Sequence, residues 1–78
     1  MVAEESPNVG EKICLIHSEI SEAVKGYQED LMDDKLPHRH MMEVELADAR
    51  IRLLDLAGYL KLNLQNVCLL YTSDAADD

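Results

Sequence analysis

The chain has 78 residues, and its 16 Asp and Glu against 7 Lys and Arg give a formal charge of -9. This charge repels polyanions and argues against nucleic acids and anionic membranes as partners, so a polyphosphate ligand would have to arrive with cations. A chain of this length builds one small domain whose core is marginal without a metal, disulfides or a partner subunit. The acidic N-terminus lacks the apolar region of a signal peptide, and no segment approaches the roughly 18 apolar residues of a membrane span. We therefore expect a soluble, cytoplasmic protein.

The first predicted helix begins after Asn8 and runs to about Met32. Asn8 can accept a backbone N–H as N-cap, and Glu11 follows three residues later, as in a capping box. Apolar residues then recur every three or four positions, which places them along one stripe of a helix. The members of this first-helix stripe are Ile13, Ile16, Ile20, Val24, Tyr27 and Leu31. We expect the stripe to be the core face, and Cys14 and Cys68 to be small core hydrophobes without a disulfide.

A turn and a second helix follow. Pro37 and the charges around it, in residues 33–38, predict the turn, and the second helix begins near 38–40 and continues to about Leu60. At 100° per residue this helix has two separate apolar faces. One face contains Val44, Ala47, Ile51, Leu54 and Gly58, and the other contains Met42, Leu46, Leu53, Ala57 and Leu60. Because one hairpin cannot cover both faces, we expect an all-α helical hairpin that self-associates, as a homodimer or homotetramer, into a four-helix bundle.

Four carboxylates lie on the two predicted helices in two short pairs. Glu19 and Glu22 are adjacent on the first helix, and Glu45 and Asp48 belong to a polar stripe between the apolar faces of the second. Either pair alone is ordinary on a solvated helix. In an antiparallel hairpin, however, the pairs lie at similar height and converge. Enclosed carboxylates need protons or cations, and this many oxygen ligands suit Mg²⁺ or Mn²⁺ better than Zn²⁺.

These two pairs carry a resemblance to a known family. The motif Glu-x-x-Glu, 22 residues, Glu-x-x-Asp, with the surrounding words "IHSEISEAVKGYQEDLMDDKLPHR" and "EVELADARIRLLDLAG", resembles the MazG-like all-alpha nucleoside triphosphate pyrophosphohydrolases over residues 8–66. The resemblance implies Mg²⁺ held by Glu19, Glu22, Glu45 and Asp48. It also implies hydrolysis of a nucleoside triphosphate to the monophosphate and pyrophosphate, often to remove non-standard nucleotides. One of the glutamates, with Glu19 and Glu22 as candidates, would be the base that activates the water.

The chain departs from the family pattern after residue 66. The family continues into a helix with basic phosphate-binding residues, whereas this chain ends in "VCLLYTSDAADD". That ending resembles a translated sequencing adapter, so we expect residues 1–66 to form a truncated MazG-like domain and residues 67–78 a disordered tail. A natural short variant with an acidic tail is the alternative. The competing function is a non-catalytic helical oligomerisation module or an inactive fragment.

Some basic residues and histidines could take part in a site, but each also has a simpler explanation. Lys12 lies two turns before Glu19, and Arg52 lies one turn after Asp48, so each could contact a phosphate of the substrate. Each could equally form an ion pair with a nearby acid, which is the interpretation that helix spacing favours. The histidines at the turn are expected to have surface or capping roles, because short His pairs are often incidental.

Overall fold

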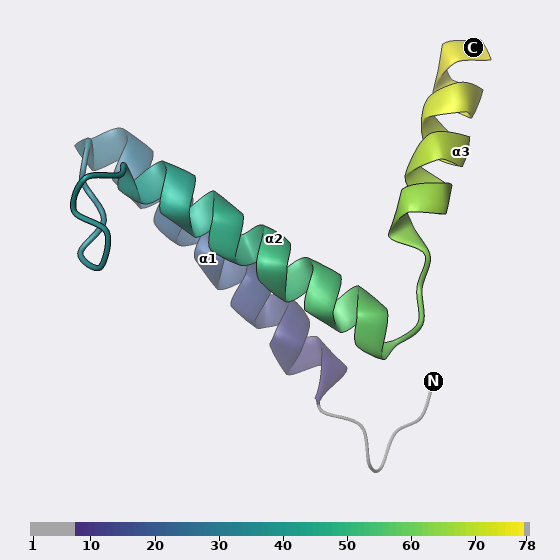
Figure 1. Ribbon diagram of the computed structural model, residues 1–78, viewed down its shortest axis with the longest axis horizontal. Coiled ribbons are helices and arrows are strands. Elements are labelled where there is room, and N and C mark those ends of the chain that lie inside the picture. The colour runs from purple at the N-terminus through teal and green to yellow at the C-terminus, as the bar shows by residue number, and fades with distance from the viewer. Residues whose placement is uncertain (1–7, 78) are drawn as a thin grey trace.

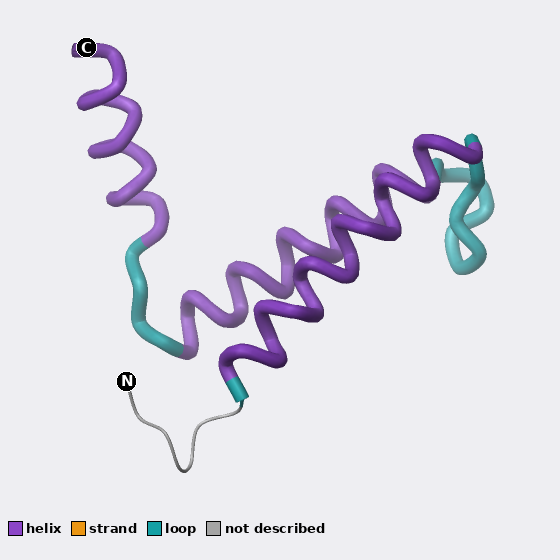
Figure 2. The backbone as a smooth tube through the Cα atoms, turned by 180° about the vertical axis from the view of Figure 1, so that it is seen from behind, coloured by secondary structure: helices purple, strands orange, loops and turns teal. Residues whose placement is uncertain are grey.

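The computed structural model describes residues 8–77, with side chains through Ser73. This part of the chain contains three helices and no strand. They are α1 (Val9–Glu29), α2 (Met41–Tyr59) and α3 (Leu64–Asp77). α1 and α2 lie side by side as an antiparallel hairpin, and α3 projects away from its end (Figures 1 and 2). The all-α prediction is confirmed. None of these helices has the length and apolarity needed to cross a membrane.

Both ends of α1 are set by local hydrogen bonds. The side chain of Asn8 accepts the backbone N–H of Glu11 at 2.9 Å, which confirms Asn8 as the N-cap. The helix ends at Glu29, three residues before the predicted Met32. The cause is Asp30, which adopts a left-handed conformation with φ of 52° and donates its backbone N–H to the Gly26 carbonyl, closing the helix.

The loop between α1 and α2 is fixed by side chains that bond to the backbone. The buried carboxylate of Asp33 accepts two backbone N–H groups of the loop, including that of Leu36 at 2.7 Å. The ring of His40 accepts the backbone N–H of Met42 at 3.1 Å and lies 3.0 Å from Asp30, so His40 is the N-cap of α2. The capping role expected for the turn histidines therefore holds for His40. These contacts turn the chain back along α1.

α1 packs against α2 through small residues. Ala23 and Gly26 are buried on α1, and Ala49 is buried on α2. A Cβ atom on Gly26 would lie 2.8 Å from the Cβ of Met41, so the two backbones approach closely at this point. The distance between the two helices is therefore short at the end of the hairpin near the loop.

The first-helix stripe lies on a flank of the hairpin, and its prediction as the core face is wrong. Four of its six members are exposed: Ile13, Ile20, Val24 and Tyr27, with relative exposures of 45%, 43%, 49% and 69%. The small residues beside the stripe make the contact with α2, because they permit the closer approach of the two helices. Cys14 is likewise free and exposed, as is Cys68, so neither is the core hydrophobe that was expected.

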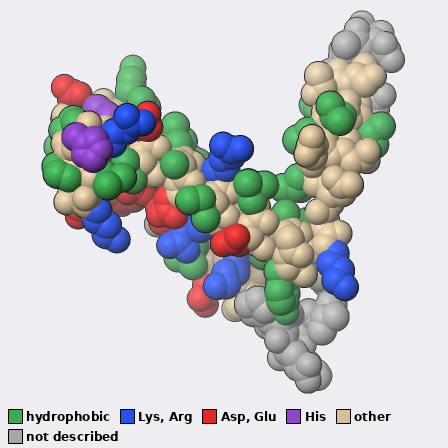
Figure 3. All heavy atoms as spheres, in the orientation of Figure 1, with side chains coloured by type: hydrophobic (Ala, Val, Ile, Leu, Met, Phe, Trp, Pro, Cys, Tyr) green, Lys and Arg blue, Asp and Glu red, His purple; other side chains and the backbone are tan. Residues whose placement is uncertain are grey.

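Both apolar faces of α2 also point largely outward. Leu46 and Leu53 on one face, and Ile51 and Leu54 on the other, are exposed. α1 covers the polar stripe between these faces instead. Hydrophobic side chains therefore lie open on the surface of the hairpin (Figure 3). Among the described residues, no large side chain is fully buried.

α3 includes most of the residues for which the sequence predicted a disordered tail, 67–78. A short turn precedes it, in which Lys61 takes a left-handed conformation with φ of 60° and closes α2. The side chain of Asn63 accepts the backbone N–H of Asn66 at 3.0 Å and starts the new helix. Residues 64–77 are thus helical, which differs from the expectation, and residue 78 lies outside the described residues.

Candidate functional site

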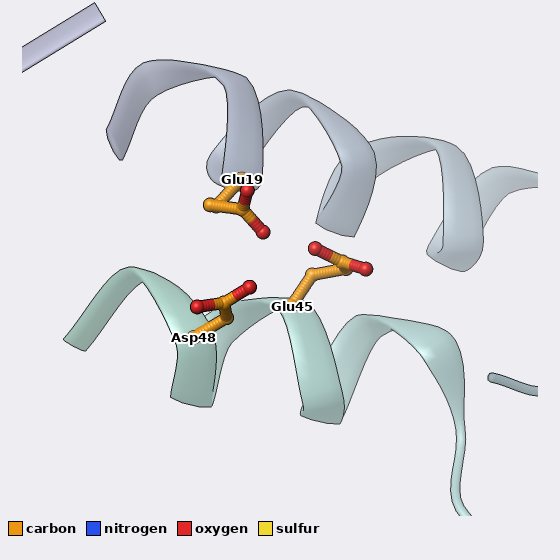
Figure 4. A group of neighbouring side chains, drawn as sticks. All are labelled: Glu19, Glu45 and Asp48. Atoms are coloured by element: carbon orange, nitrogen blue, oxygen red, sulfur yellow. The ribbon is translucent and has the colours of Figure 1, made fainter. Parts of the chain in front are cut away.

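Three carboxylates meet between α1 and α2. Glu19 points from α1 toward Glu45 and Asp48 on α2, and one oxygen atom of each lies within 4.8 Å of the other two (Figure 4). All three residues are half-buried. The predicted convergence of the two helices' acids is therefore found for three of the four residues.

Helix geometry explains why these three side chains come together. Glu45 and Asp48 are three residues apart and project from the same side of α2, the side that α1 covers. On α1, Glu19 lies one turn before the buried Ala23 and so belongs to the side that faces α2. The acids thus occupy the centre of the helix contact, where a small soluble domain would normally place apolar residues.

The crowding of the three acids changes the protonation of one of them. The pKa of Glu19 is raised from 4.5 to about 7, first by a side-chain hydrogen bond with Glu45 and by burial. A hydrogen bond with Asp48 and repulsion from both neighbours add to the effect. The metal-free cluster therefore binds a proton more readily than a separate glutamate does.

Arg52 is the basic residue that reaches the cluster. Its Nε atom lies 3.4 Å from Asp48 Oδ1, one turn earlier on α2, and 3.6 Å from Glu19 Oε1 across the hairpin. The ion pair favoured for this residue from the sequence is present and joins both helices. Sequence spacing indicated the partner on the same helix, whereas the partner on α1 depends on the packing of the hairpin.

Glu22 lies outside the group of three, although it remains close by. Its side chain is exposed and helps to line a hollow of about 350 Å³ that also contains Glu45, Lys25 and Met41. On α1, Glu22 is three residues beyond Glu19, which turns it toward the edge of the hairpin. The structure therefore brings Glu19, Glu45 and Asp48 together and places Glu22 beside them at the rim.

A second hollow adjoins the cluster on the other side. Its walls are Lys12 from α1 and Arg52, Asp55, Leu56 and Tyr59 from α2. The two cations predicted as phosphate contacts thus share one hollow. Leu56 and Tyr59 were not predicted as site residues. Their helical spacing from Arg52, at four and seven residues, is the signal that would have placed them on the same side of α2.

The donor set fits a hard divalent cation. Mg²⁺ binds carboxylate oxygens at about 2.1 Å, so oxygens at neighbouring positions of an octahedral ion are about 3.0 Å apart and those at opposite positions about 4.2 Å apart. One oxygen of each acid lies within 4.8 Å of the other two, so side-chain movements would bring them closer together around an ion. Three carboxylates without His or Cys favour Mg²⁺ or Mn²⁺ over Zn²⁺. Glu22 would join such a site only through a larger movement or a bridging water.

No protein-family model, curated protein or solved structure matches this chain.

Proposed function

We propose that the protein is a Mg²⁺-dependent nucleoside triphosphate pyrophosphohydrolase that removes unwanted nucleotides from the cellular pool. The observation that carries this proposal is the meeting of Glu19, Glu45 and Asp48 between two helices. Three carboxylates gathered in a helix contact weaken the fold unless a cation or proton compensates them, so a binding role gives a reason for their position. The similarity of the two acid pairs to the MazG-like motif supports the same proposal.

Each acid has a role in this proposal. Glu19, Glu45 and Asp48 would hold Mg²⁺, or Mn²⁺ in its place. The bound ion would lower the pKa of a water molecule and offset the charge that develops on the phosphates. Glu22 is our candidate for the base that takes the proton from the attacking water, because its carboxylate lies at the rim beside Glu45. Glu19 is the alternative base.

The hollow beside the cluster would receive the substrate's phosphates. Lys12 and Arg52 supply positive charge there in a protein whose formal charge is -9. Hydrolysis adds water across the bond between the α and β phosphates, and it releases the nucleoside monophosphate and pyrophosphate. The chain's own contribution would be to hold Lys12 and Arg52 in one hollow beside the acids, where they would position the phosphates.

The decisive experiment is an assay for pyrophosphate. The purified chain is incubated with Mg²⁺ and a panel of standard and non-standard nucleoside triphosphates. We expect Mg²⁺-dependent release of pyrophosphate, reduced at least about a hundredfold in Glu45→Gln and in Glu22→Gln. The Glu29→Gln variant, changed at an exposed site at the end of α1, is the matched control. Release of orthophosphate instead, or equal rates in all variants, would contradict the proposal.

Self-association completes the proposed architecture. Large apolar side chains of both helices, among them Ile20, Leu46 and Leu53, are exposed on the hairpin. An exposed apolar surface of this kind gains stability when a second copy removes it from water. A second copy that covers the exposed apolar faces would form a four-helix bundle, as a homodimer or a homotetramer. A folded monomer in sedimentation at micromolar concentration would overturn this part of the proposal.

The same exposed faces favour one alternative function, a non-catalytic helical oligomerisation module. In that case the acids would be a half-buried polar seam without a ligand. The two functions are separated by one comparison: the module self-associates but neither releases pyrophosphate nor gains stability from Mg²⁺.

A further inference from the structure

Arg52 forms ion pairs with two of the three clustered acids in the metal-free hairpin. Its guanidinium bridges Asp48 and Glu19, the acids of two different helices, at 3.4 and 3.6 Å. The Glu19 side chain is only 15% exposed, whereas that of Arg52 is 42% exposed. The Arg52 side chain is therefore partly in contact with solvent, and it pairs with a glutamate that is mostly buried.

A divalent ion and this guanidinium would compete for the same carboxylate groups. An ion bound at about 2.1 Å from the carboxylates would lie within a few ångströms of the Arg52 charge. Charges of the same sign at that separation repel strongly, even in a partly solvated site. Two of the three carboxylates that the ion would need, those of Asp48 and Glu19, also pair with Arg52. The ion and the arginine therefore disfavour each other at the cluster.

The neighbouring hollow offers Arg52 another position. Arg52 already lines that hollow, together with Lys12, Asp55 and Tyr59. Asp55 lies three residues beyond Arg52 on α2, within reach of a long side chain that rotates away from Asp48. In that position Arg52 would stand beside Lys12, and the two would present a paired positive charge to a phosphate group.

We propose that Arg52 is an internal counter-cation of the Glu19, Glu45 and Asp48 cluster, which a divalent metal ion displaces toward Lys12. This inference rests on the proposed metal-binding function. It makes two statements: Arg52 stabilises the metal-free hairpin, and Arg52 weakens the affinity of the site for the metal alone. A loaded site would release the arginine to contact the phosphates, so metal and substrate would favour each other's binding.

The test measures the binding of Mn²⁺ alone, by calorimetry and by the electron paramagnetic resonance signal of the free ion, together with thermal melts without metal. Arg52→Met removes the charge and keeps much of the apolar stem. Arg50→Met is the matched control, because Arg50 is exposed and lies about 200° around α2 from Arg52 while carrying the same charge. We expect Arg52→Met to bind Mn²⁺ at least about tenfold more tightly than the wild type and to melt at a lower temperature without metal. Arg50→Met should change neither property appreciably.

Each other outcome has a defined meaning. Equal Mn²⁺ affinities in the wild type and both variants would overturn the counter-cation role and leave the metal site intact. Weaker binding by Arg52→Met would also overturn it, because the arginine would then support the site. The absence of Mn²⁺ binding in every variant would overturn both this inference and the proposed function. Arg52→Gln, which keeps a polar side chain, serves the same comparison if Arg52→Met does not fold.

Discussion

The hairpin places acids on its inner side and large apolar side chains on its outer sides, which is the reverse of most small domains. The inner side, where α1 meets α2, contains the acids Glu19, Glu45 and Asp48 together with small residues, whereas the flanks contain most of the large apolar side chains. An apolar flank stabilises the folded protein only when another surface covers it and removes it from water. The inner side therefore provides the chemistry of the proposed site, and the flanks provide the reason for assembly.

The largest effect is expected from a charge on the apolar flank. Ile20 lines both apolar hollows along the flank formed by α1 and α2, so it lies at the centre of the surface proposed for self-association. Ile20→Glu would place an unpaired charge in the covered interface, at a cost of about 3–5 kcal/mol. We expect dissociation and loss of helix, measured by sedimentation and circular dichroism.

Ser18→Glu is the matched control for that change. It adds the same charge to α1 at an exposed polar position on the other side of the helix from Ile20. We expect it to leave both association and helix content unchanged. If Ile20→Glu behaves like Ser18→Glu, then the apolar flank is exposed in solution and the comparison between flank and inner side fails.

The second prediction concerns pH and the inner side. The pKa of Glu19 rises from 4.5 to about 7 on folding, so between these values the folded state binds a proton that the unfolded state has released. Stability without metal should therefore be greatest below about pH 4.5 for this group and fall as the pH rises to about 7. Thermal melts across this window should show the decline in the wild type. In Glu19→Gln, which cannot ionise, the decline should be smaller, while Glu29→Gln should retain it.

The third prediction is stabilisation by Mg²⁺. An ion that binds only the folded state stabilises it by about 2.7 kcal/mol when its free concentration is a hundredfold above the dissociation constant. Glu45→Gln should abolish this gain and leave the metal-free protein as stable as the wild type or more stable, because one repelling carboxylate is removed. Glu29→Gln should keep the gain. Melts with and without Mg²⁺ measure both effects, and a wild type that shows no Mg²⁺ dependence would remove the support for the metal site.

The fourth prediction tests how closely the helices approach at Gly26. A methyl group there would lie 2.8 Å from the Cβ of Met41, so Gly26→Ala should separate the helices and cost about 1–3 kcal/mol. Gly58→Ala is the control, because apart from the adjoining backbone of its own helix nothing lies within 4 Å of its added methyl group. There the higher helix propensity of alanine should stabilise α2 by up to about 1 kcal/mol. Denaturant unfolding of both variants gives the comparison directly, and equal effects would show that the close approach is unimportant.

Much of the fold follows from local patterns in the sequence. The N-cap at Asn8, the turn near Pro37 and the bounds of α2 agree with the structure to within a few residues. These features depend on side chains that bond to their own backbone or on the period of one helix. The meeting of Glu19 with Glu45 and Asp48 also follows from the lengths of two helices and one turn.

The packing of the hairpin could not be predicted in the same way. The first-helix stripe was expected at the core because apolar periodicity identifies a buried side, but it does not identify which neighbour covers that side. Ala23 and Gly26 set the contact because they permit a shorter distance between the helices, a property of the pair of helices together. For the same reason Glu22 was grouped with the other acids, although a rotation of α1 leaves it at the rim. The approach of Arg52 to α1 likewise depends on that rotation.

The smallest effect is expected from the removal of residues 67–78. α3 projects away from the hairpin, and its side chains from Val67 to Tyr71 are exposed (Figure 1). Deletion should therefore change the free energy of unfolding by less than about 0.5 kcal/mol, as for a surface change without packing partners. Denaturant titration and sedimentation of the shortened chain, beside the full chain, measure stability and association together. Lower stability with unchanged association would indicate that α3 packs on its own hairpin, whereas loss of association would assign α3 to the covered interface. Either result would mean that α3, like the apolar flanks, contributes a surface that is covered. If deletion changes neither stability nor association, the apolar flanks of the hairpin are, among the described residues, sufficient for assembly.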